Sequence, residues 1–368
     1  MTPPAVSRRD RAPATGWRIE RRLHVGKLSE AIALPLALLV ALIASSLLIL
    51  ITGVGITDGL SALWNGAFGS RHATFETLVQ ATPLIFTGLA AAVAFRARIW
   101  NIGGEGQFFA GAMGTFWVAH TFSGLPTVLM IPAVLLGAGL AGAAWAAIAG
   151  YLKARYGTNE IITTVMLNFT ILLIVSYLLG GPWRAPDTFY YQTVRIPKAS
   201  WLPRFFSDSR LHWGLVVALA VGILVYILVE RTSLGFELRG LGINRNAAVL
   251  KGISVGETTL IVMAISGAIA GLAGASEVAG IHHRLQVDIS SGYGFTGIII
   301  ALIGRLNPFG VVAAAIGFGA LVNGSTAMQI STGIPAALVD VIQGLSLVSV
   351  LVAAVAVRYR IRKPQRRG

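Results

Sequence analysis

The chain has 368 residues, of which 55% are hydrophobic and 12% charged, and its mean hydropathy is +0.73. A soluble protein of this length could not expose so much apolar surface to water, so the composition predicts an integral membrane protein. The absence of cysteine excludes disulfides, thiolate catalysis and cysteine metal sites. The net charge of +14 does not indicate nucleic-acid binding, because the basic residues lie beside apolar segments, where they attract anionic membrane lipid.

Apolar segments long enough for membrane helices follow one another along the chain, since a helix needs roughly 20 residues to cross a bilayer. They are 31–53, 78–95, 102–122, 126–150, 160–180, 212–230, 259–281, 293–304, 308–328 and 334–357. The first is too long for a cleaved signal peptide. We therefore predict an all-α polytopic membrane protein with about ten transmembrane helices. Residues 31–357 form the transmembrane domain, between a basic N-terminal tail (1–30) and a basic C-terminal tail (358–368).

The basic residues predict the orientation of these helices. Of the 29 Lys and Arg, 22 lie in the two tails and in every second gap between segments, and 7 lie in the other gaps. Basic residues resist translocation across the membrane. Both termini and the long loop 231–258 are therefore predicted to be cytoplasmic, and the loop 181–212 extracytoplasmic.

Glycines interrupt two of the segments. The eighth, 293–304, is short and glycine-rich at its start, and the third, 102–122, opens with Gly103, Gly104 and Gly106. Non-helical backbone at membrane depth is tolerated only where protein or a watery cavity covers it, so these breaks are expected near a solute route. The run 104–108 also resembles 292–295. Spans two to five run opposite to spans seven to ten, which predicts an inverted-topology repeat.

The loop between the sixth and seventh spans contains an amphipathic segment. Asn244 is positioned to cap a short helix containing Ala247 and Ala248, and Gly252 to end it. Such a helix must bury its apolar side. It lies either on the membrane surface or in a groove of another protein.

This loop carries a family resemblance. The run Glu237–Ile253 resembles the coupling loop of bacterial ABC importer permeases of the branched-chain amino acid, ribose and nucleoside superfamily, and Met263–Ala275 resembles the span that follows it. Three further runs are similar to the nucleoside and simple-sugar branch: Phe95–Phe108, Asn159–Asn168 and Gly297–Gly310. The resemblance covers residues 78–357 in the family's order.

The resemblance implies a permease subunit for a nucleoside or simple sugar, located in the bacterial plasma (inner) membrane. Its implied partners are a cytoplasmic ATP-binding subunit, a second permease subunit that is a different chain, and an extracytoplasmic substrate-binding protein. A phosphate-binding loop needs Gly-Lys followed by Ser or Thr. Only Lys27 follows a glycine, and Leu28 comes after it. We therefore predict that the chain is not an enzyme and has no cofactor or metal, with ATP hydrolysis in the partner. The residues expected to couple to that partner are Glu237, Arg239, Gly240, Asn244, Ala247, Ala248 and Gly252.

Polar and aromatic residues within the spans are candidates for the translocation pathway, namely Gln107, Phe108, Thr164, Asn168, Phe295, Asp340 and Gln343. Thr164 and Asn168 share one helix face, where they either meet solute or bond a neighbouring helix. Asp340 and Gln343 share a face too, and either line the route or pair structurally. A proton-coupled secondary transporter, with Asp340 or Glu105 as the proton carrier, is the alternative function.

Other residues have simpler expected roles. Glu105 is expected to pair with Arg96 or Arg98, and Glu277 with the basic run 282–284. Gly267, Gly271 and Gly274 are expected to permit close helix packing. Aromatic residues in the loop 181–212 form either a membrane-interface belt or, in its middle, a docking surface for the binding protein.

Overall fold

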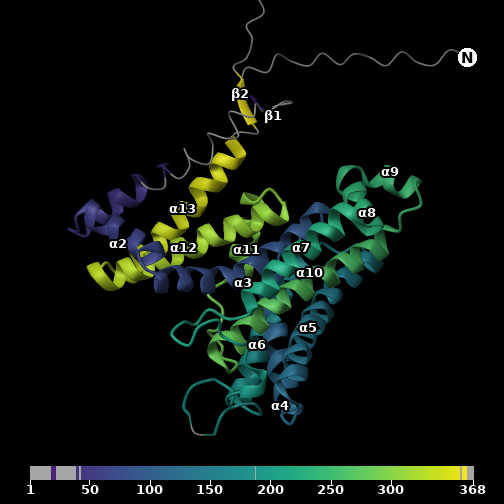
Figure 1. Cartoon of the computed structure of the whole chain (residues 1–368). Helices are drawn as coiled ribbons and strands as arrows, with labels where there is room; N and C mark the ends of the chain where they lie inside the picture. The colour runs from purple at the N-terminus through teal and green to yellow at the C-terminus, as the bar shows by residue number, and fades with distance from the viewer. Residues whose placement is uncertain (1–17, 22–38, 41–42, 187, 357–358, 363–368) are drawn as a thin grey trace, which may run out of the picture.

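Apolar runs separated by glycine, proline and basic residues form helices along almost the whole chain in the computed structural model, which describes residues 18–21, 39–40, 43–186, 188–356 and 359–362 (Figure 1). A helix Ile43–Ile51 precedes the labelled elements. In chain order these are β1 (Arg18–Arg21), α2 (Ile56–Phe68), α3 (Arg71–Arg96), α4 (Gly104–Thr121), α5 (Thr127–Tyr156), α6 (Glu160–Gly180), the 3-10 turn η1 (Lys198–Ser200), α7 (Gly214–Arg231), α8 (Ser233–Ile243), α9 (Arg245–Leu250), α10 (Val255–Glu277), the π-helical turn η2 (Val278–His282), α11 (Tyr293–Ile303), α12 (Pro308–Thr332), α13 (Ala336–Ala356) and β2 (Tyr359–Arg362).

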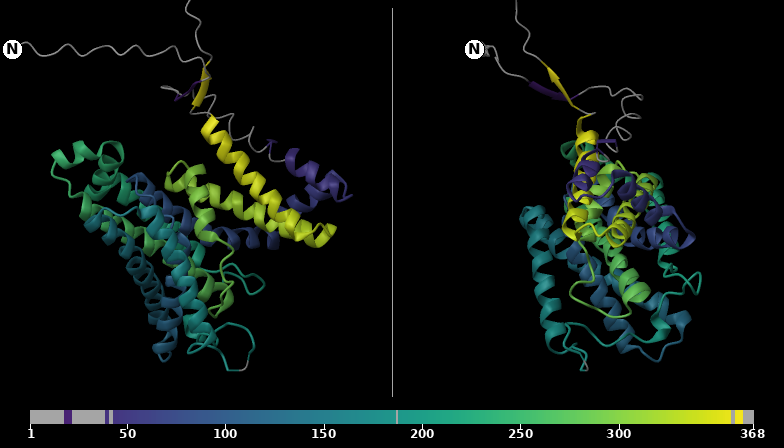
Figure 2. Two further views of the ribbon diagram at one scale, coloured as in Figure 1. Left: turned by 180° about the vertical axis from the view of Figure 1, so that it is seen from behind. Right: turned by 90° about the vertical axis from the view of Figure 1, so that its left-hand side faces the viewer.

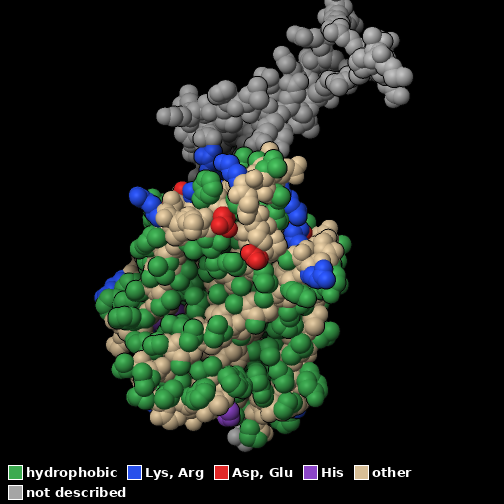
Figure 3. All heavy atoms as spheres, turned by 90° about the vertical axis from the view of Figure 1, so that its right-hand side faces the viewer, with side chains coloured by type: hydrophobic (Ala, Val, Ile, Leu, Met, Phe, Trp, Pro, Cys, Tyr) green, Lys and Arg blue, Asp and Glu red, His purple; other side chains and the backbone are tan. Residues whose placement is uncertain are grey.

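The predicted helical membrane fold is confirmed. Among the described residues, six helices are long and apolar enough to cross a membrane: α3, α5, α6, α7, α10 continued through η2, and α12. A seventh span results if Ile43–Ile51 and α2 count as one bent pair. Apolar side chains cover the body of the molecule in Figure 3, and Lys and Arg gather around one end of it. This arrangement suits a protein whose body lies in hydrocarbon.

The start of the chain differs from the prediction of one span over 31–53. Within the described part, the helix Ile43–Ile51 ends where Gly53 takes a left-handed φ of 78°, and α2 follows at a bend of 117°. The second span is also longer than predicted, because Ser70 caps α3 by accepting a hydrogen bond from Ala73 N at 3.0 Å. The sequence did not predict α2, because polar residues interrupt its apolar run. Residues 31–38 lie outside the described residues.

The two predicted tails contribute a short β-ribbon outside the helical membrane domain. β1 pairs antiparallel with β2, with Arg18 opposite Arg362 and Arg21 opposite Tyr359. Four residues per strand are too few to give a period-two pattern that stands out in a sequence. The ribbon places residues 18–21 beside residues 359–362 (Figure 1).

Helices α4, α5 and α10 approach one another unusually closely through glycines. A Cβ added to Gly271 of α10 would overlap the carbonyl oxygen of Ala138 in α5, and one added to Gly111 of α4 would overlap Gly271 itself. Gly267 meets Gly142 of α5 in the same way. In lipid, no hydrophobic force drives helices together. Small residues stabilise the contact instead, because they let the two backbones touch. The predicted role of these glycines in packing is confirmed.

The contacts between helices keep the same pattern when α3, α4, α5 and α6 are exchanged with α10, α11, α12 and α13, respectively. α3 packs on α12 as α10 packs on α5, and α11 packs on α3 as α4 packs on α10. α4 contacts α5 as α11 contacts α12, and α4 contacts α11 directly. This exchange is what the predicted repeat of spans two to five in spans seven to ten requires.

At the end opposite α8 and α9, the loop after α6 folds onto the end of α10. Thr193 N donates to Leu285 O (3.0 Å) and Leu202 N to Ala279 O (2.9 Å). The His212 ring fills the space over Gly280, where any side chain would overlap it. Trp201 stacks on His283 with ring centroids 3.7 Å apart. Glu277 pairs with His282 (Oε2 to Nε2, 3.4 Å) as expected.

The two buried histidines make this end sensitive to acid. Burial lowers the pKa of both His212 and His283 from 6.5 to about 4, so the folded chain keeps them neutral. Between these values the unfolded chain binds more protons, and stability therefore falls as pH drops from about 6.5 towards 4. Both ring nitrogens of His283 are buried without a partner among the described atoms. We predict that His283→Phe, which keeps the stack on Trp201, reduces this loss of stability.

The measurement is the thermal unfolding midpoint of each variant between about pH 7 and pH 5, the range in which histidine charge changes. His120→Phe is the matched control, because His120 is exposed and stacks on Phe116. It should leave the pH dependence unchanged. Equal pH dependence in the parent and His283→Phe would contradict the prediction.

Candidate functional site

The chain between α3 and α4, residues 97–103, folds back into the interior of the helix bundle. Asn101 Nδ2 donates to Ser266 Oγ of α10 (2.9 Å), and Ser266 Oγ donates to the carbonyl of Ala90 (2.7 Å). Ala90 precedes the end of α3 by six residues, which is about 9 Å along a helix. The third apolar segment therefore starts with non-helical backbone at depth, as its glycines predicted, and α4 begins inside the molecule.

Buried side chains satisfy the backbone of this 97–103 segment and of the first turn of α4. Asn168 of α6 accepts from Gly106 N (2.8 Å) and donates to Ile102 O (3.0 Å). Thr164 Oγ1 accepts from Ile102 N (3.3 Å). Asn101 and Gln107 pair through both amide groups, at 3.0 and 2.9 Å. Because unpaired polar backbone is costly away from water, these contacts hold the segment in place.

The N-termini of α4 and α11 meet next to this segment. Gly294 N donates to Glu105 Oε2 at 2.8 Å, and the backbones are so close that a Cβ at Gly294 would overlap Glu105 N. The expected ion pair of Glu105 with Arg96 or Arg98 is wrong, because α4 begins too deep in the molecule. Arg96 instead pairs with Glu230 (Nη1 to Oε1, 2.6 Å).

Five of the seven predicted pathway residues lie around this junction: Gln107, Phe108, Thr164, Asn168 and Phe295. The first four are buried. Phe108 packs near Tyr293 (ring centroids 5.9 Å apart), and Phe295 is 46% exposed. The polar atoms of Gln107, Thr164 and Asn168 bond protein groups, so their contact with solute stays a prediction.

Asp340 and Gln343 lie elsewhere, on α13. Asp340 is exposed and Gln343 is half-buried. Neighbouring residues of α13 pack in a separate apolar cluster with Ile49, Met328 and Ile334. α13 lies alongside α12, apart from α4 and α6, in both views of Figure 2. The structure therefore does not bring these two residues to the junction of α4 and α11.

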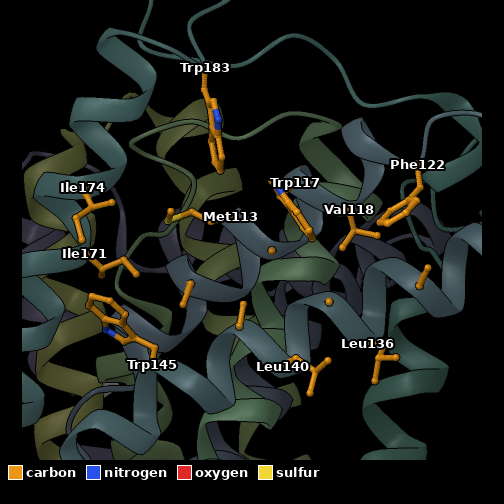
Figure 4. Close-up of a pocket in the computed structure, with 15 residues that line it drawn as sticks. Met113, Trp117, Val118, Phe122, Leu136, Leu140, Trp145, Ile171, Ile174 and Trp183 are labelled. Atoms are coloured by element: carbon orange, nitrogen blue, oxygen red, sulfur yellow. The ribbon is translucent and has the colours of Figure 1, made fainter.

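A hollow of about 590 Å³ opens between α4, α5 and α6. Figure 4 shows Met113, Trp117, Trp145, Leu140 and Trp183 around it. Its lining is apolar, and a solute with several hydroxyl groups would lose hydrogen bonds to water there without replacement. The hollow is thus a poor place for a sugar or the ribose of a nucleoside.

The loop between α7 and α10 contains two helices, α8 and α9, where the sequence predicted one. The α9 helix is capped as predicted, because Asn244 Oδ1 accepts from Asn246 N (3.0 Å) and Ala247 N (3.2 Å). Gly252 follows α9 with a left-handed φ of 81°. α8 is capped by Thr232, whose hydroxyl accepts from Gly235 N at 3.1 Å.

α8 is held against the ends of the transmembrane helices. Its Leu238 and Leu241 are buried. Glu237 accepts a hydrogen bond from Thr258 of α10 (3.2 Å), and Arg239 pairs with Glu230 at 3.2 Å and donates to Val229 O. Gly242 touches the carbonyl of Arg96 so closely that no side chain would fit. α8 is therefore anchored to α3, α7 and α10.

The far side of this helix pair is exposed and apolar. Leu250 is 89% exposed and Ile243 79%, and Val249 of α9 and Phe236 of α8 are also exposed. We call these four residues the α8–α9 tip. Of the predicted coupling residues, Asn244, Ala247 and Gly252 are exposed, Ala248 is buried, and Gly240 is half-buried. A cluster of exposed apolar side chains on an anchored helix pair indicates a surface for a partner or for lipid.

Sequence reasoning missed the polar residues that connect elements. Asn101, Ser266 and Glu230 were not candidates, although they join α3, α4, α7, α8 and α10. Asn101 directly precedes the glycine-rich start of the third segment, and that position was an available signal. Nothing in the sequence pairs Glu230 with Arg96, 134 residues away.

Comparisons with known proteins agree with this architecture. Residues 73–351 match the family described as "Branched-chain amino acid transport system / permease component". The chain is 36% identical to the guanosine ABC transporter permease protein NupP of Bacillus subtilis, covering 94% of this chain and 99% of that protein. It is 36% identical to the glucose ABC transporter permease protein TsgB13 of Haloferax volcanii (89% and 88% covered). It is 32% identical to the nucleoside ABC transporter permease protein NupB of Lactococcus lactis (83% and 86% covered).

Proposed function

Because this chain belongs to the permease component family of the branched-chain amino acid transport systems, we propose that it is the membrane subunit of an ATP-binding cassette importer whose solute is a nucleoside. Relatives named for guanosine and nucleoside transport support the solute, and a simple sugar is the second choice because one relative is named for glucose. One observation supports the placement of transport and ATP hydrolysis in separate subunits. It is the anchored helix pair α8–α9 with its exposed apolar tip. It offers a partner a surface and ties that surface to the transmembrane helices.

The proposed assembly follows from the two ends of the molecule. The end with α8 and α9 carries the basic loops and faces the cytoplasm of a bacterial plasma membrane, together with both chain ends. An ATP-binding subunit docks there. At the opposite end, the loop 181–212 carries five basic residues and exposed aromatics such as Phe189 and Tyr190, which suit an acidic patch on a substrate-binding protein. A second permease chain, different from this one, completes the pathway.

The rival function is a proton-coupled carrier. Glu105 is bonded to the backbone of α11, and Asp340 lies away from the junction of α4 and α11. Asp340 is thus separated from the polar residues around the 97–103 segment, and the Glu105 carboxylate is occupied by a backbone contact. Collapsing the proton gradient while ATP is maintained separates the two functions, because an importer driven by ATP continues to accumulate nucleoside.

The sharpest test uses the α8–α9 tip. We predict that Leu250→Asp abolishes co-purification of the ATP-binding subunit in mild detergent and ATP-dependent nucleoside uptake, because a carboxylate cannot enter an apolar groove without losing its hydration. Ser233→Asp is the control, since it adds the same charge at an exposed position at the start of α8, away from the end of α9. Retention of the ATP-binding subunit by Leu250→Asp would contradict docking at the tip.

A further inference from the structure

A continuous line of polar contacts leads from α8 into the membrane domain. Arg239 of α8 bonds Oε2 of Glu230 at 3.2 Å, while Oε1 of the same carboxylate bonds Arg96 at 2.6 Å. Arg96 Nε in turn donates to the carbonyl of Leu306 at 2.9 Å. We call this set the Arg239–Glu230–Arg96 relay. These three contacts connect four parts of the chain: α8, the end of α7, the end of α3, and the turn between α11 and α12.

The relay ends on a strained turn. Arg305 and Leu306 have φ angles of 58° and 59°, the left-handed region that residues other than glycine occupy at a cost of about 1–3 kcal/mol each. Such a conformation persists only where its surroundings hold it. Leu306 is held by its own N–H to Ala301 O (2.9 Å) and by the Arg96 side chain on its carbonyl. A change in the position of Arg96 therefore acts directly on the turn that follows α11.

α11 connects this turn to the junction with α4. It has 11 residues, about 16 Å of rigid helix. The turn that follows its C-terminus is bonded by Arg96, and its first turn by Glu105, through Gly294 N. Along its length Gly297 and Ile300 lie directly against Thr87 and Gly88 of α3. α3 and α11 are thus built to move as one unit when Arg96 is displaced.

Resting on the proposed function, we infer that the Arg239–Glu230–Arg96 relay carries the movement of α8 through the turn at Leu306 and along α11 to its junction with α4. Glu230 is the positioning residue at its centre. Its side chain is 36% exposed, so each ion pair adds little stability. What the carboxylate provides is geometry, because its two oxygens hold two guanidinium groups on different elements at once.

The absence of cysteine in the chain gives a clean readout. A single cysteine in place of Phe295, which is exposed in the first turn of α11, reports movement of α11 through its rate of reaction with a thiol reagent. The assay uses the full importer complex in proteoliposomes, with and without ATP and vanadate. In the Phe295→Cys parent, we expect nucleotide trapping to change the labelling rate by about fivefold or more, a typical allosteric factor.

Glu230→Gln keeps the shape of the side chain and removes the charge that holds both arginines. We expect it to abolish the nucleotide response at position 295 and to lower the ratio of uptake to ATP hydrolysis, with the ATP-binding subunit still bound. Glu257→Gln is the matched control, because Glu257 is an exposed glutamate in the first turn of α10 without an ion pair among the described residues. It should leave both readouts unchanged.

The outcomes are distinguishable. If no ATP-binding subunit binds the parent, the proposed function fails and the relay with it. If the subunit binds but labelling at position 295 ignores nucleotide, or responds equally in Glu230→Gln, the relay is overturned and the proposed function stands. Should Glu230→Gln not assemble, Arg239→Lys serves instead, since a lysine keeps the charge but replaces the planar guanidinium whose Nη1 bonds both Glu230 and Val229 O.

Discussion

Gly271→Ala should destabilise the protein by about 3 kcal/mol and abolish most of the folded permease, whereas the same substitution at Gly317 should be neutral or stabilising by about 0.5–1 kcal/mol. A methyl group at Gly271 has nowhere to go, because it would overlap the carbonyl oxygen of Ala138 and force α5 and α10 apart. At Gly317, in the middle of α12, nothing lies within 4 Å of the position a Cβ would take. The substitution then only reduces the conformational freedom of the unfolded chain.

The comparison is made on the thermal unfolding midpoint and on the yield of monodisperse protein in mild detergent. Because both variants make the same chemical change in a helix, intrinsic helix propensity cancels between them. A Gly271→Ala protein as stable as the Gly317→Ala protein would mean that α5 and α10 are not in backbone contact.

Asn101→Leu should destabilise the protein by about 2–3 kcal/mol and abolish uptake, because it leaves several buried groups unpaired, each costing about 1–3 kcal/mol before relaxation. Asn101 is the single residue that bonds Gln107, Ser266 and the backbone of Gly103. Without it, the 97–103 segment loses its fixed position beside α10. The start of α4, and with it the contact of Glu105 with α11, should then become disordered.

A second substitution tests this explanation. In the double variant Asn101→Leu with Gln107→Leu, the amide left unpaired by the first change is also removed, so the double variant should be less destabilised than the sum of the two single variants. Asn65→Leu is the control, because Asn65 is exposed on α2 and should change the unfolding midpoint little. Additive effects of Asn101→Leu and Gln107→Leu would argue against the amide pair.

The fold was largely predictable from apolar runs and glycines. The ten predicted segments fall on helices wherever the chain is described, and the glycine-rich starts of the third and eighth segments correspond to α4 and α11, which meet inside the molecule. The cap of α9 at Asn244 was predictable because it depends on three neighbouring residues. α2 and the ribbon of β1 and β2 were not predictable, because neither has a long apolar or strictly alternating pattern.

The candidate site was predictable in residue type but not in role. Thr164 and Asn168 were selected as polar residues on one helix face, and the structure shows that they bond the backbone of the 97–103 segment. Asp340 and Gln343 matched the same rule yet lie on α13, away from that segment. A helical period places residues on one face, and it does not say which helix that face meets.

The sequence alone was enough to predict that the protein lies in a membrane, where its helices lie, and which family it belongs to. These properties depend on hydropathy, glycine breaks and short motifs, which involve only a few consecutive residues. Only the tertiary structure decided the pairing of Glu230 with Arg96 and Arg239, the bond from Gly294 to Glu105, and the contact of Gly271 with Ala138. Most of these contacts join residues far apart in the sequence, and their energies depend on distances of a few ångströms. Such distances are set by how the helices pack.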